Sequence, residues 1–600
     1  LAAVVVGTWL WLPRSQWSDV AGGVLASATY TENWRMALNG QAYAVADPLS
    51  SPVQHIWSLS VQGQIFIALP ILLLAARAIL GRAGLDADQV LGALVAGIAV
   101  ATLGSLVYAV VGVRDNQAFA YFDTAARLWE YLAGTLVAVF AVRWAPRKGL
   151  ATAMGWTGML AILATGVVLD GRATFPGLTA LLPIGGAVLL IVAGLGAGAS
   201  SRWSVSRFLA WRPLVTAGGF AAVFARRPWV GVGFALAASG LESFGWLAGG
   251  VVLLVSGVMA WAGRMLVSRG PRTPANVGEA RARPRWTGRV PATAVLVLAL
   301  AVPVGWLSYR EMNPWTGSGD LDPQVHPGAL TLLDSGRWPT AAGVDFIPAL
   351  DNARSDWPLA GREDCETAGP DDVDVNLCVI GDPAGAVTVA LVGGSHSVNF
   401  AEPLDALAKE NGVRIEGYFK QGCPLALWDE IVDDPRLQSC ADWSLAVLDR
   451  LADSNVRGVI TTGTRPGSEL EAWDDGDYVP DGYVAAWAWL DDRGIGVAAI
   501  RDNPWFDSDP LVCIDRFGAD SDACAVSRAD ALGSDLLVSA LLSDSFASID
   551  LSDALCEEEL CRPVIGNVLA YIDSNHLTAT YSRTLAPAFV RELRDVPWWP

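Results

Sequence analysis

The first half of the chain consists of successive apolar runs, and most of them are long enough to cross a bilayer. A membrane-spanning helix needs roughly 20 apolar residues. One such run also fits a buried helix of a soluble protein, but eight in succession predict a multi-pass α-helical membrane domain. The runs lie at about 64–81, 90–112, 124–144, 151–169, 175–197, 212–238, 245–263 and 291–308, and residues 1–12 look like the end of another. Because the chain begins at Leu1, inside an apolar run and without Met, we expect N-terminal sequence to be missing.

Basic residues gather at alternate ends of these runs and orient the chain. Arg and Lys in short connectors favour the cytoplasmic side of a membrane. They cluster at Arg77 and Arg82, at 143–148, at 202–212 and at 264–290, where there are seven Arg. The alternation requires 212–238 to cross once as a long interrupted helix, with Arg226 and Arg227 near the outer surface or along a polar cavity. The last run then leads outward, so the C-terminal half is predicted to be extracytoplasmic.

The segment 13–63 is then expected to be an outer loop, and its last part contains His55. A lone His is more often structural than catalytic. Arg127 and Glu130 lie three residues apart at the start of the run at 124–144, where they can pair on one helix face. Such a pair indicates either a functional site or a simple ion pair at the membrane interface.

Two strings carry a resemblance to a known family. PVQHIWSLSVQGQIF (52–66) and FDTAARLWEYLAG (122–134) resemble motifs of the acyltransferase-3 membrane O-acyltransferases, over about residues 1–270. The chain departs from the family at Gln62 and Gly63, where two Glu are usual, and at Arg226 and Ser268, which replace a His and a Glu. The resemblance implies an acyl-transfer pathway lined by His55, Trp57, Ser58, Arg127 and Glu130.

All eight cysteines lie in the second half of the chain, and they form close pairs in sequence. An even set confined to one domain indicates disulfides and an oxidising compartment. Reduced thiols or zinc are the alternatives, but zinc sites favour CxxC spacing and clustered His, which are missing. The favoured pairing joins neighbours: Cys365 with Cys378, Cys423 with Cys440, Cys513 with Cys524, and Cys556 with Cys561.

The second half reads as an acidic α/β domain behind a short extension. It supplies most of the net charge of -20, which argues against a nucleic-acid partner. Residues 309–350, rich in Pro, Gly and Asp, read as a linker or irregular extension. Strands then alternate with helices, which predicts a parallel sheet wrapped by helices. Strands are expected at 386–394, 413–419, 457–464 and 495–504, helices at 402–412, 444–455 and 482–494, and a strand, a loop and a helix within 567–593.

Two polar stretches at strand ends suggest a nucleophilic site. Gly393-Gly394-Ser395 follows the first strand, and glycines there permit a tight turn that presents a serine. Asp573 and His576 lie three apart near the last expected strand, where the carboxylate can orient the imidazole. Each stretch alone is more often a turn or a surface loop. Together they supply the base that a weak serine nucleophile needs.

The two stretches resemble the blocks of the SGNH (GDSL-like) hydrolases. The resemblance makes Ser395 the nucleophile, His576 the base and Asp573 its partner, with the backbone N–H groups of Ser395 and Gly422 as oxyanion donors. Gly394 replaces the usual Asp of that block, and the family's Asn donor has no match because 461–467 occupies its place. A bridge between Cys423 and Cys440 would hold the Gly422 loop. We favour a structural role for His396 and assign none to His326.

An acyltransferase-3 membrane domain followed by an SGNH domain is typical of bacterial envelope proteins that O-acetylate peptidoglycan or surface polysaccharides. The resemblance implies a multi-pass protein of the bacterial plasma membrane, with no bound cofactor or metal. Acyl groups, acetyl in the typical case, would pass from an acyl-CoA such as acetyl-CoA through Ser395 to a glycan hydroxyl. The alternatives are a membrane-anchored carbohydrate esterase and an inactive scaffold. The expected parts are 1–270, a connector and final span at 271–308, an extension at 309–350 and an α/β three-layer domain at 351–600.

Overall fold

The computed structural model describes most of the chain in several stretches. These are residues 1–38, 51–141, 146–169, 175–195, 203–216, 289–312, 321–359, 372–428, 435–466, 476–533 and 544–600, with a few isolated positions between them. The chain forms two compact units. One comprises Leu1–Leu12 and Gln16–Met312, and the other comprises Pro13–Ser15 and Asn313–Pro600.

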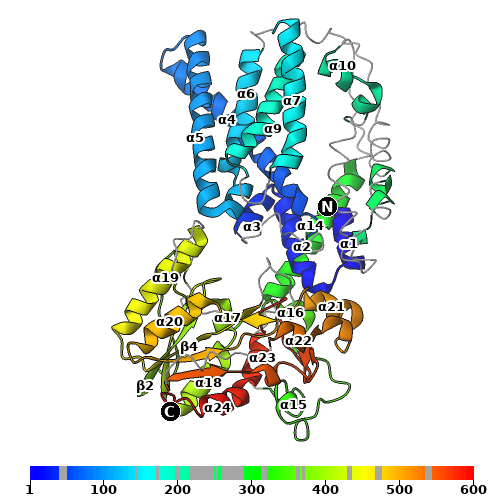
Figure 1. Ribbon diagram of the computed structural model, residues 1–600. Helices are drawn as coiled ribbons and strands as arrows, with labels where there is room; N and C mark the ends of the chain where they lie inside the picture. The colour runs from blue at the N-terminus through cyan, green and yellow to red at the C-terminus, as the bar shows by residue number, and fades with distance from the viewer. Residues whose placement is uncertain are drawn as a thin grey trace. The chain divides into compact units, whose positions relative to one another are not determined.

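The first unit is helical throughout its described part (Figure 1). Four helical stretches are long and apolar enough to cross a membrane, namely Gln54–Arg82, Ala87–Arg114, Lys148–Val168 and Leu178–Leu195. They coincide with predicted runs. The helices are α1 (Ala2–Trp11), α2 (Trp17–Ala28), α3 (Glu32–Leu38), α4 (Trp57–Arg82), α5 (Ala87–Phe122), α6 (Thr124–Ala141), α7 (Lys148–Val168), α9 (Leu181–Leu195), α10 (Val205–Leu209) and α14 (Arg289–Met312).

The remaining predictions for this unit have mixed outcomes. Helices α6 and α14 occupy the expected runs at 124–144 and 291–308, although neither is among the four candidate spans found within the described residues. The segment 13–63, expected to be an outer loop, contains the short helices α2 and α3 with the buried side chains of Val24 and Met36, and its side of the membrane stays a prediction. Most of the predicted runs at 212–238 and 245–263 lies outside the described residues, and so do Arg226, Arg227 and Ser268.

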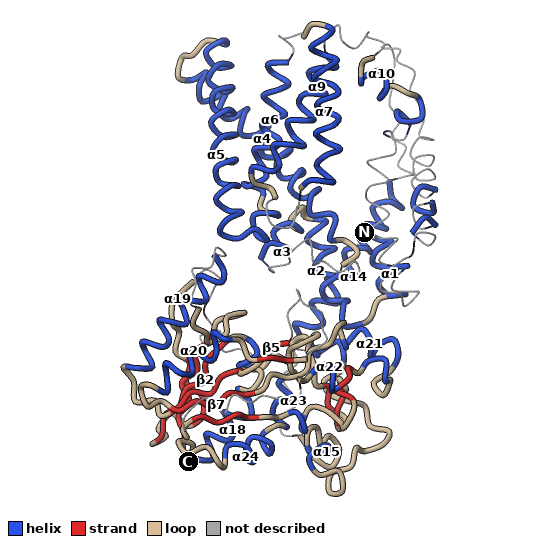
Figure 2. Tube along the Cα trace, in the orientation of Figure 1, coloured by secondary structure: helices blue, strands red, loops and turns tan. Residues whose placement is uncertain are grey.

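The second unit is built on a six-stranded sheet in the order β1-β3-β2-β4-β7-β9 (Figure 2). All neighbouring pairs are parallel except β1 with β3. The predicted parallel sheet is therefore confirmed. The strands are β1 (Cys378–Gly381), β2 (Val387–Gly393), β3 (Val413–Phe419), β4 (Gly458–Thr462), β7 (Gly496–Ile500) and β9 (Phe546–Ile549).

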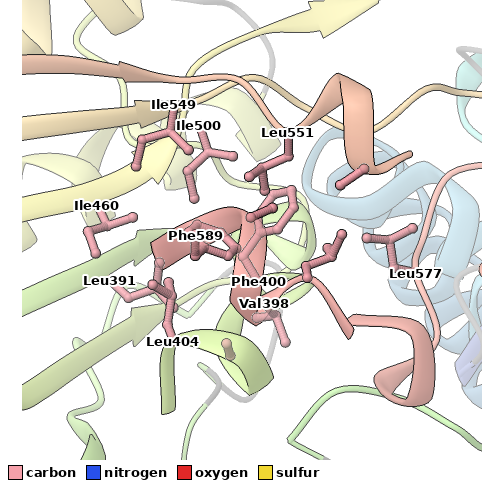
Figure 3. Close-up of a cluster of buried hydrophobic side chains, with 14 of the residues drawn as sticks. Leu391, Val398, Phe400, Leu404, Ile460, Ile500, Ile549, Leu551, Leu577 and Phe589 are labelled. Atoms are coloured by element: carbon pink, nitrogen blue, oxygen red, sulfur yellow. The ribbon is translucent and has the colours of Figure 1, made fainter. Parts of the chain in front are cut away.

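Helices cover both faces of this sheet because successive strand residues point to opposite faces. Val389 and Leu391 belong to one core, whereas Ala390 and Val392 belong to the other. Figure 3 shows the first core, where Leu391 and three isoleucines from neighbouring strands surround Phe400, Leu404 and Phe589. That core contains residues of α18 (Ala401–Asn411) and α24 (Ala586–Leu593), and the second contains residues of α19 (Pro435–Ala452) and α20 (Asp481–Asp491).

The extension before the sheet packs onto the second unit. Ala329 is fully buried in its first core, and the Gly328 N–H donates to the Gly566 carbonyl over 3.1 Å. Ile347 forms a parallel bridge with Val568. The part of the predicted linker that the structure describes is thus an irregular extension of the domain, with the short helices α15 (Leu330–Leu333) and α16 (Leu350–Ala353).

Smaller elements and four disulfides complete this unit. The disulfides join each cysteine to its predicted neighbour, which confirms that pairing. The last strand, β12, pairs with β11 in a hairpin and not with the main sheet. The small elements are α17 (Ser395–Val398), α21 (Pro510–Phe517), α22 (Arg528–Ala531), α23 (Ala579–Thr584), β5 (Arg465–Pro466), β6 (Asp477–Tyr478), β8 (Val526–Ser527), β10 (Leu560–Cys561), β11 (Val564–Ile565) and β12 (Val568–Leu569).

Candidate active site

Ser395 begins the short helix α17, directly after the carboxyl end of β2. Gly393 has φ +144°, and a Cβ at this position would collide with the Ser397 hydroxyl. At Gly394 a Cβ would lie 3.2 Å from the backbone nitrogen of Cys423. Glycine is therefore required at 393 for the turn itself, whereas at 394 it permits the close approach of the Cys423 loop.

Three residues meet at this turn in a hydrogen-bonded chain. His576 Nε2 lies 2.9 Å from Ser395 Oγ, and its Nδ1 lies 2.8 Å from Asp573 Oδ2. The Asp573 carboxylate also accepts the backbone N–H groups of Asn575 and His576. Ser395 is 9% exposed, which leaves its hydroxyl accessible from a pocket. The structure thus brings together the serine, histidine and aspartate that the sequence singled out.

The surroundings of Asp573 keep it ionised. Burial raises its pKa, but the hydrogen bond and charge of His576 and the two backbone N–H groups lower it more, so the pKa lies below its ordinary value. An ionised carboxylate accepts a proton-bearing Nδ1 and leaves Nε2 facing the serine. This arrangement fits His576 to take the proton of Ser395.

The two residues expected to supply the oxyanion donors, Ser395 and Gly422, line the same small pocket. The pocket has a volume of about 50 Å³, and Gly422 and Thr464 contribute to its wall. Among the described residues, neither the Ser395 nor the Gly422 backbone N–H donates to a protein acceptor. The Cys423–Cys440 disulfide and the hydrogen bond from the Lys420 N–H to the Gly393 carbonyl, 3.1 Å long, fasten the Gly422 turn beside the nucleophile.

A second imidazole lies against the first, and sequence reasoning did not assign it to the site. The ring of His396 lies 4.9 Å from that of His576 and is stacked on Trp505. Its Nδ1 lies 2.9 Å from Asp502 Oδ1, and Asp502 also accepts the Trp505 Nε1–H. Asp502 and Trp505 follow β7, so only the pairing of β7 in the sheet brings them here. His326 lies in the extension, where its Nε2 is 3.3 Å from the Asp345 carbonyl oxygen.

Each of the five membrane-half candidates contacts another member of the set. Arg127 is buried, donates to Glu130 over 2.6 Å, and lies over the ring of Trp57 at 5.3 Å. The Ser58 hydroxyl donates to the His55 carbonyl. The predicted ion pair of Arg127 with Glu130 is therefore present, and aromatic rings enclose its cation. A buried ion pair at the start of α6 is expensive unless it is satisfied in this way.

Gly63, one of the departures from the acyltransferase-3 motif, is tightly packed. A Cβ at this position would collide with the ring of Tyr30. Gln64 beside it donates to the Tyr30 carbonyl over 2.6 Å and accepts a hydrogen bond from the Thr124 hydroxyl over 2.6 Å. The usual Glu would therefore require Tyr30 to move.

Comparisons with known proteins identify part of the second unit. Residues 364–591 match the family model described as an SGNH domain (fused to AT3 domains). Among solved structures, the periplasmic domain of the lipopolysaccharide acetyltransferase of Salmonella ser. Paratyphi A is similar at 16% identity. The match covers 35% of this chain and 85% of that chain, with a TM-score of 0.26. No curated protein matches the chain. The matched residues include Ser395, Asp573 and His576, so all three lie within the SGNH domain.

Proposed function

We propose that this protein transfers acyl groups, acetyl in the simplest case, to hydroxyls of a cell-envelope glycan through an acyl-serine at Ser395. The hydrogen-bonded chain from Ser395 through His576 to Asp573 carries the proposal. Its place in an SGNH domain of the kind fused to AT3 domains supports it. The four apolar spans and the four disulfides fit a membrane protein with an extracytoplasmic C-terminal unit, which we assign to the bacterial plasma membrane.

In the first half-reaction Ser395 attacks the carbonyl carbon of the acyl donor. His576 takes the serine proton as the new C–O bond forms, and Asp573 stabilises the resulting imidazolium. The backbone N–H groups of Ser395 and Gly422 face the developing negative charge on oxygen. The donor's leaving group then departs with the proton held by His576, and the acyl group stays on Ser395 as an ester.

In the second half-reaction a glycan hydroxyl attacks the same carbonyl. His576 takes the hydroxyl proton and returns it to Ser395 Oγ as the serine ester breaks. Water in place of the sugar would give hydrolysis by the same steps. The transferase and the esterase therefore share one acyl-enzyme and differ only in what attacks it.

The size of the Ser395 pocket favours a short acyl group. Its volume is about 50 Å³, whereas one water molecule needs at least about 10–15 Å³ of such space. An acetyl group fits such a space, and a long acyl chain would require the surrounding loops to open.

In the proposed pathway the first unit passes acyl groups from a cytoplasmic acyl-CoA to Ser395. The pair of Arg127, which is buried, and Glu130, which is partly buried, lies in this helical unit with Trp57 over the cation. Buried ionisable residues in membrane segments commonly mark such pathways. His55 and Ser58 lie at the start of α4, close in sequence to Trp57.

The test uses the full chain in detergent with p-nitrophenyl acetate as donor and a chito-oligosaccharide as acceptor. We expect nitrophenol release that Ser395→Ala abolishes, together with acetylated sugar. Ser397→Ala is the matched control on the same short helix, because its hydroxyl is already bonded to the Val392 carbonyl and to Thr462.

Other outcomes select the alternatives. Serine-dependent release to water alone, with several neutral acceptors ignored, would identify an esterase. No serine-dependent release and no labelling of Ser395 by a fluorophosphonate would indicate a scaffold. In vesicles, transfer from external acetyl-CoA that His55→Ala or Glu130→Gln reduces would support acyl passage through the first unit.

A further inference from the structure

A second, larger hollow lies beside the Ser395 pocket and shares two lining residues with it. Its volume is about 780 Å³, within the usual range of small-molecule sites. Asp502 and Trp505 line both the hollow and the Ser395 pocket. A molecule bound in the hollow would therefore reach the nucleophile across these two residues.

We propose that this hollow binds the acceptor as a neutral or amine-bearing sugar unit, and that Trp505 and His396 contact that sugar. The inference rests on the proposed function. It adds to that function the chemical class of the acceptor and the side of the site from which the acceptor approaches.

The charge of the hollow decides which sugars it accepts. Its described lining contains four carboxylates, Asp477, Asp502, Asp507 and Asp530, and no Lys or Arg. Arg501 neutralises Asp477 over 2.6 Å, so the net negative charge of the described lining comes from Asp502, Asp507 and Asp530. Arg465 is a cation of the neighbouring Ser395 pocket and does not line the hollow. Carboxylates accept hydrogen bonds from sugar hydroxyls and from ammonium groups, but they repel phosphates and uronates. Anionic glycans are therefore disfavoured.

Trp505 lines both spaces, and His396 lines the Ser395 pocket beside it. Their rings are stacked, with centroids 4.9 Å apart, and Asp502 fixes both through hydrogen bonds. Asp502 itself is 5% exposed, so this carboxylate is held rigidly. An indole ring fixed in this way offers a flat apolar surface to the C–H face of a sugar ring.

His396 is suited to hold a hydroxyl of the bound sugar. Asp502 accepts from Nδ1, so Nε2 is the nitrogen that can meet a ligand, and His396 lines the Ser395 pocket. A neutral imidazole accepts a hydrogen bond there. His576 remains the base in both half-reactions, because it alone of the two imidazoles is bonded to Ser395 Oγ. His396 thus orients the acceptor and removes no proton in the proposed steps.

The first experiment measures how the acyl-enzyme divides between sugar and water. The full chain is acylated with p-nitrophenyl acetate in the presence of a chito-oligosaccharide, and the ratio of acetyl-sugar to acetate is determined. Trp505→Leu and His396→Gln should each lower this ratio by about tenfold or more. Trp489→Leu is the matched control, because Trp489 lies on α20, outside the described lining, and is covered by Arg493.

The ratio of acetyl-sugar to acetate distinguishes lost binding of the acceptor from a displaced catalytic His576. Both routes use the same acyl-enzyme and the same base, so a structural defect at His576 slows both and leaves the ratio unchanged. An unchanged ratio in Trp505→Leu and His396→Gln would overturn the inference while Ser395 chemistry stands. Acetate as the only product of the unmodified protein would do the same.

A second experiment tests the hollow without any chemistry. Calorimetric titration of the Ser395→Ala full chain should show binding of a neutral chito-oligosaccharide and none of a uronic-acid oligomer of equal length. The double variant Asp507→Asn with Asp530→Asn should reduce the difference in affinity between the neutral and the uronic-acid oligomer. The control Glu410→Gln on α18 should leave that difference unchanged. Equal binding of both oligomers, or neutral binding that survives Trp505→Leu, would refute the site. Selective binding without serine chemistry would refute the proposed function and keep the site.

Discussion

Two aspartates hold the two imidazoles at Ser395, and their bonding determines how the imidazoles differ. Asp573 accepts the His576 ring and two backbone N–H groups, and His576 in turn reaches the serine hydroxyl. Asp502 accepts the His396 ring, the Trp505 indole and the Asn503 N–H. Asp573 thus orients the imidazole that contacts the nucleophile. Asp502 orients an imidazole and an indole that contact each other, which fits a role in binding rather than in proton transfer.

Asp573 should make the stability of the second unit depend on pH in acid. Its folded-state pKa is lowered from the ordinary value of 3.8. The stabilisation is therefore complete above about pH 4 and disappears as the pH falls through the folded-state pKa. Asp573→Asn lacks this titration. Calorimetric unfolding of the full chain from pH 5 to pH 2.5 should show the free energies of unfolding of the unmodified protein and of Asp573→Asn converging. A difference in unfolding free energy that widens in acid would contradict the assignment.

At the scale of elements, two turns from different strands are fastened to each other to form the site. The turn after β2 carries Gly394 and Ser395, and the turn after β3 carries Gly422 and Cys423. They approach so closely that a Cβ on Gly394 would lie 3.2 Å from the Cys423 nitrogen and 3.3 Å from its carbonyl oxygen. The position of the Gly422 N–H therefore depends on the absence of a side chain at residue 394.

Gly394→Ala should impair the site more than the fold. The backbone at this residue is extended, with φ -87°, so alanine adds no torsional strain, but its methyl group must displace the Cys423 turn. We expect the rate of fluorophosphonate labelling of Ser395 to fall by about tenfold or more, as for a displaced oxyanion donor. Gly412→Ala is the control. It has φ +62° in open space, so it should cost about 1 kcal/mol of stability and leave labelling unchanged.

Two of the disulfides provide a matched pair for the same question. Cys423–Cys440 closes 17 residues and Cys513–Cys524 closes 11, so removing either should cost about 3 kcal/mol of unfolding free energy. Only the first holds the Gly422 turn. Double Cys→Ser replacement of Cys423 and Cys440 should slow Ser395 labelling beyond what the loss of stability explains. Equal slowing by the Cys513 and Cys524 double variant would show that the bridge merely stabilises the fold.

The parts of this domain that sequence predicts are those with a local signal. β2, β3, β4 and β7 are apolar runs bounded by turns, and the Ser395 and His576 stretches carry their own spacing. β1 and β9 have four residues each and little periodicity, and they are strands because they lie beside β3 and β7. The pair of His396 and Asp502 is 106 residues apart, and it was missed because only sheet order brings the two together.

At the scale of the whole molecule, the two units require different surroundings. The first exposes large apolar side chains along its helices, such as Phe66 at 59% and Leu72 at 64%, which suits lipid. The second buries its apolar residues in two cores and contains four disulfides, with no free cysteine among its described residues. Four disulfides fit an oxidising, extracytoplasmic compartment for the second unit.

The orientation of the chain can be tested by reporter fusions. Alkaline phosphatase is active only where its disulfides form, and it should be active when joined after Pro600. The same enzyme should be inactive when joined within 264–290, because seven Arg favour the cytoplasmic side there. Green fluorescent protein, which fluoresces poorly after export, should give the reverse pattern at both sites. Phosphatase activity in the connector together with none at Pro600 would invert the topology. It would also place Ser395 on the same side as acetyl-CoA, so that acyl passage through the first unit would no longer be needed.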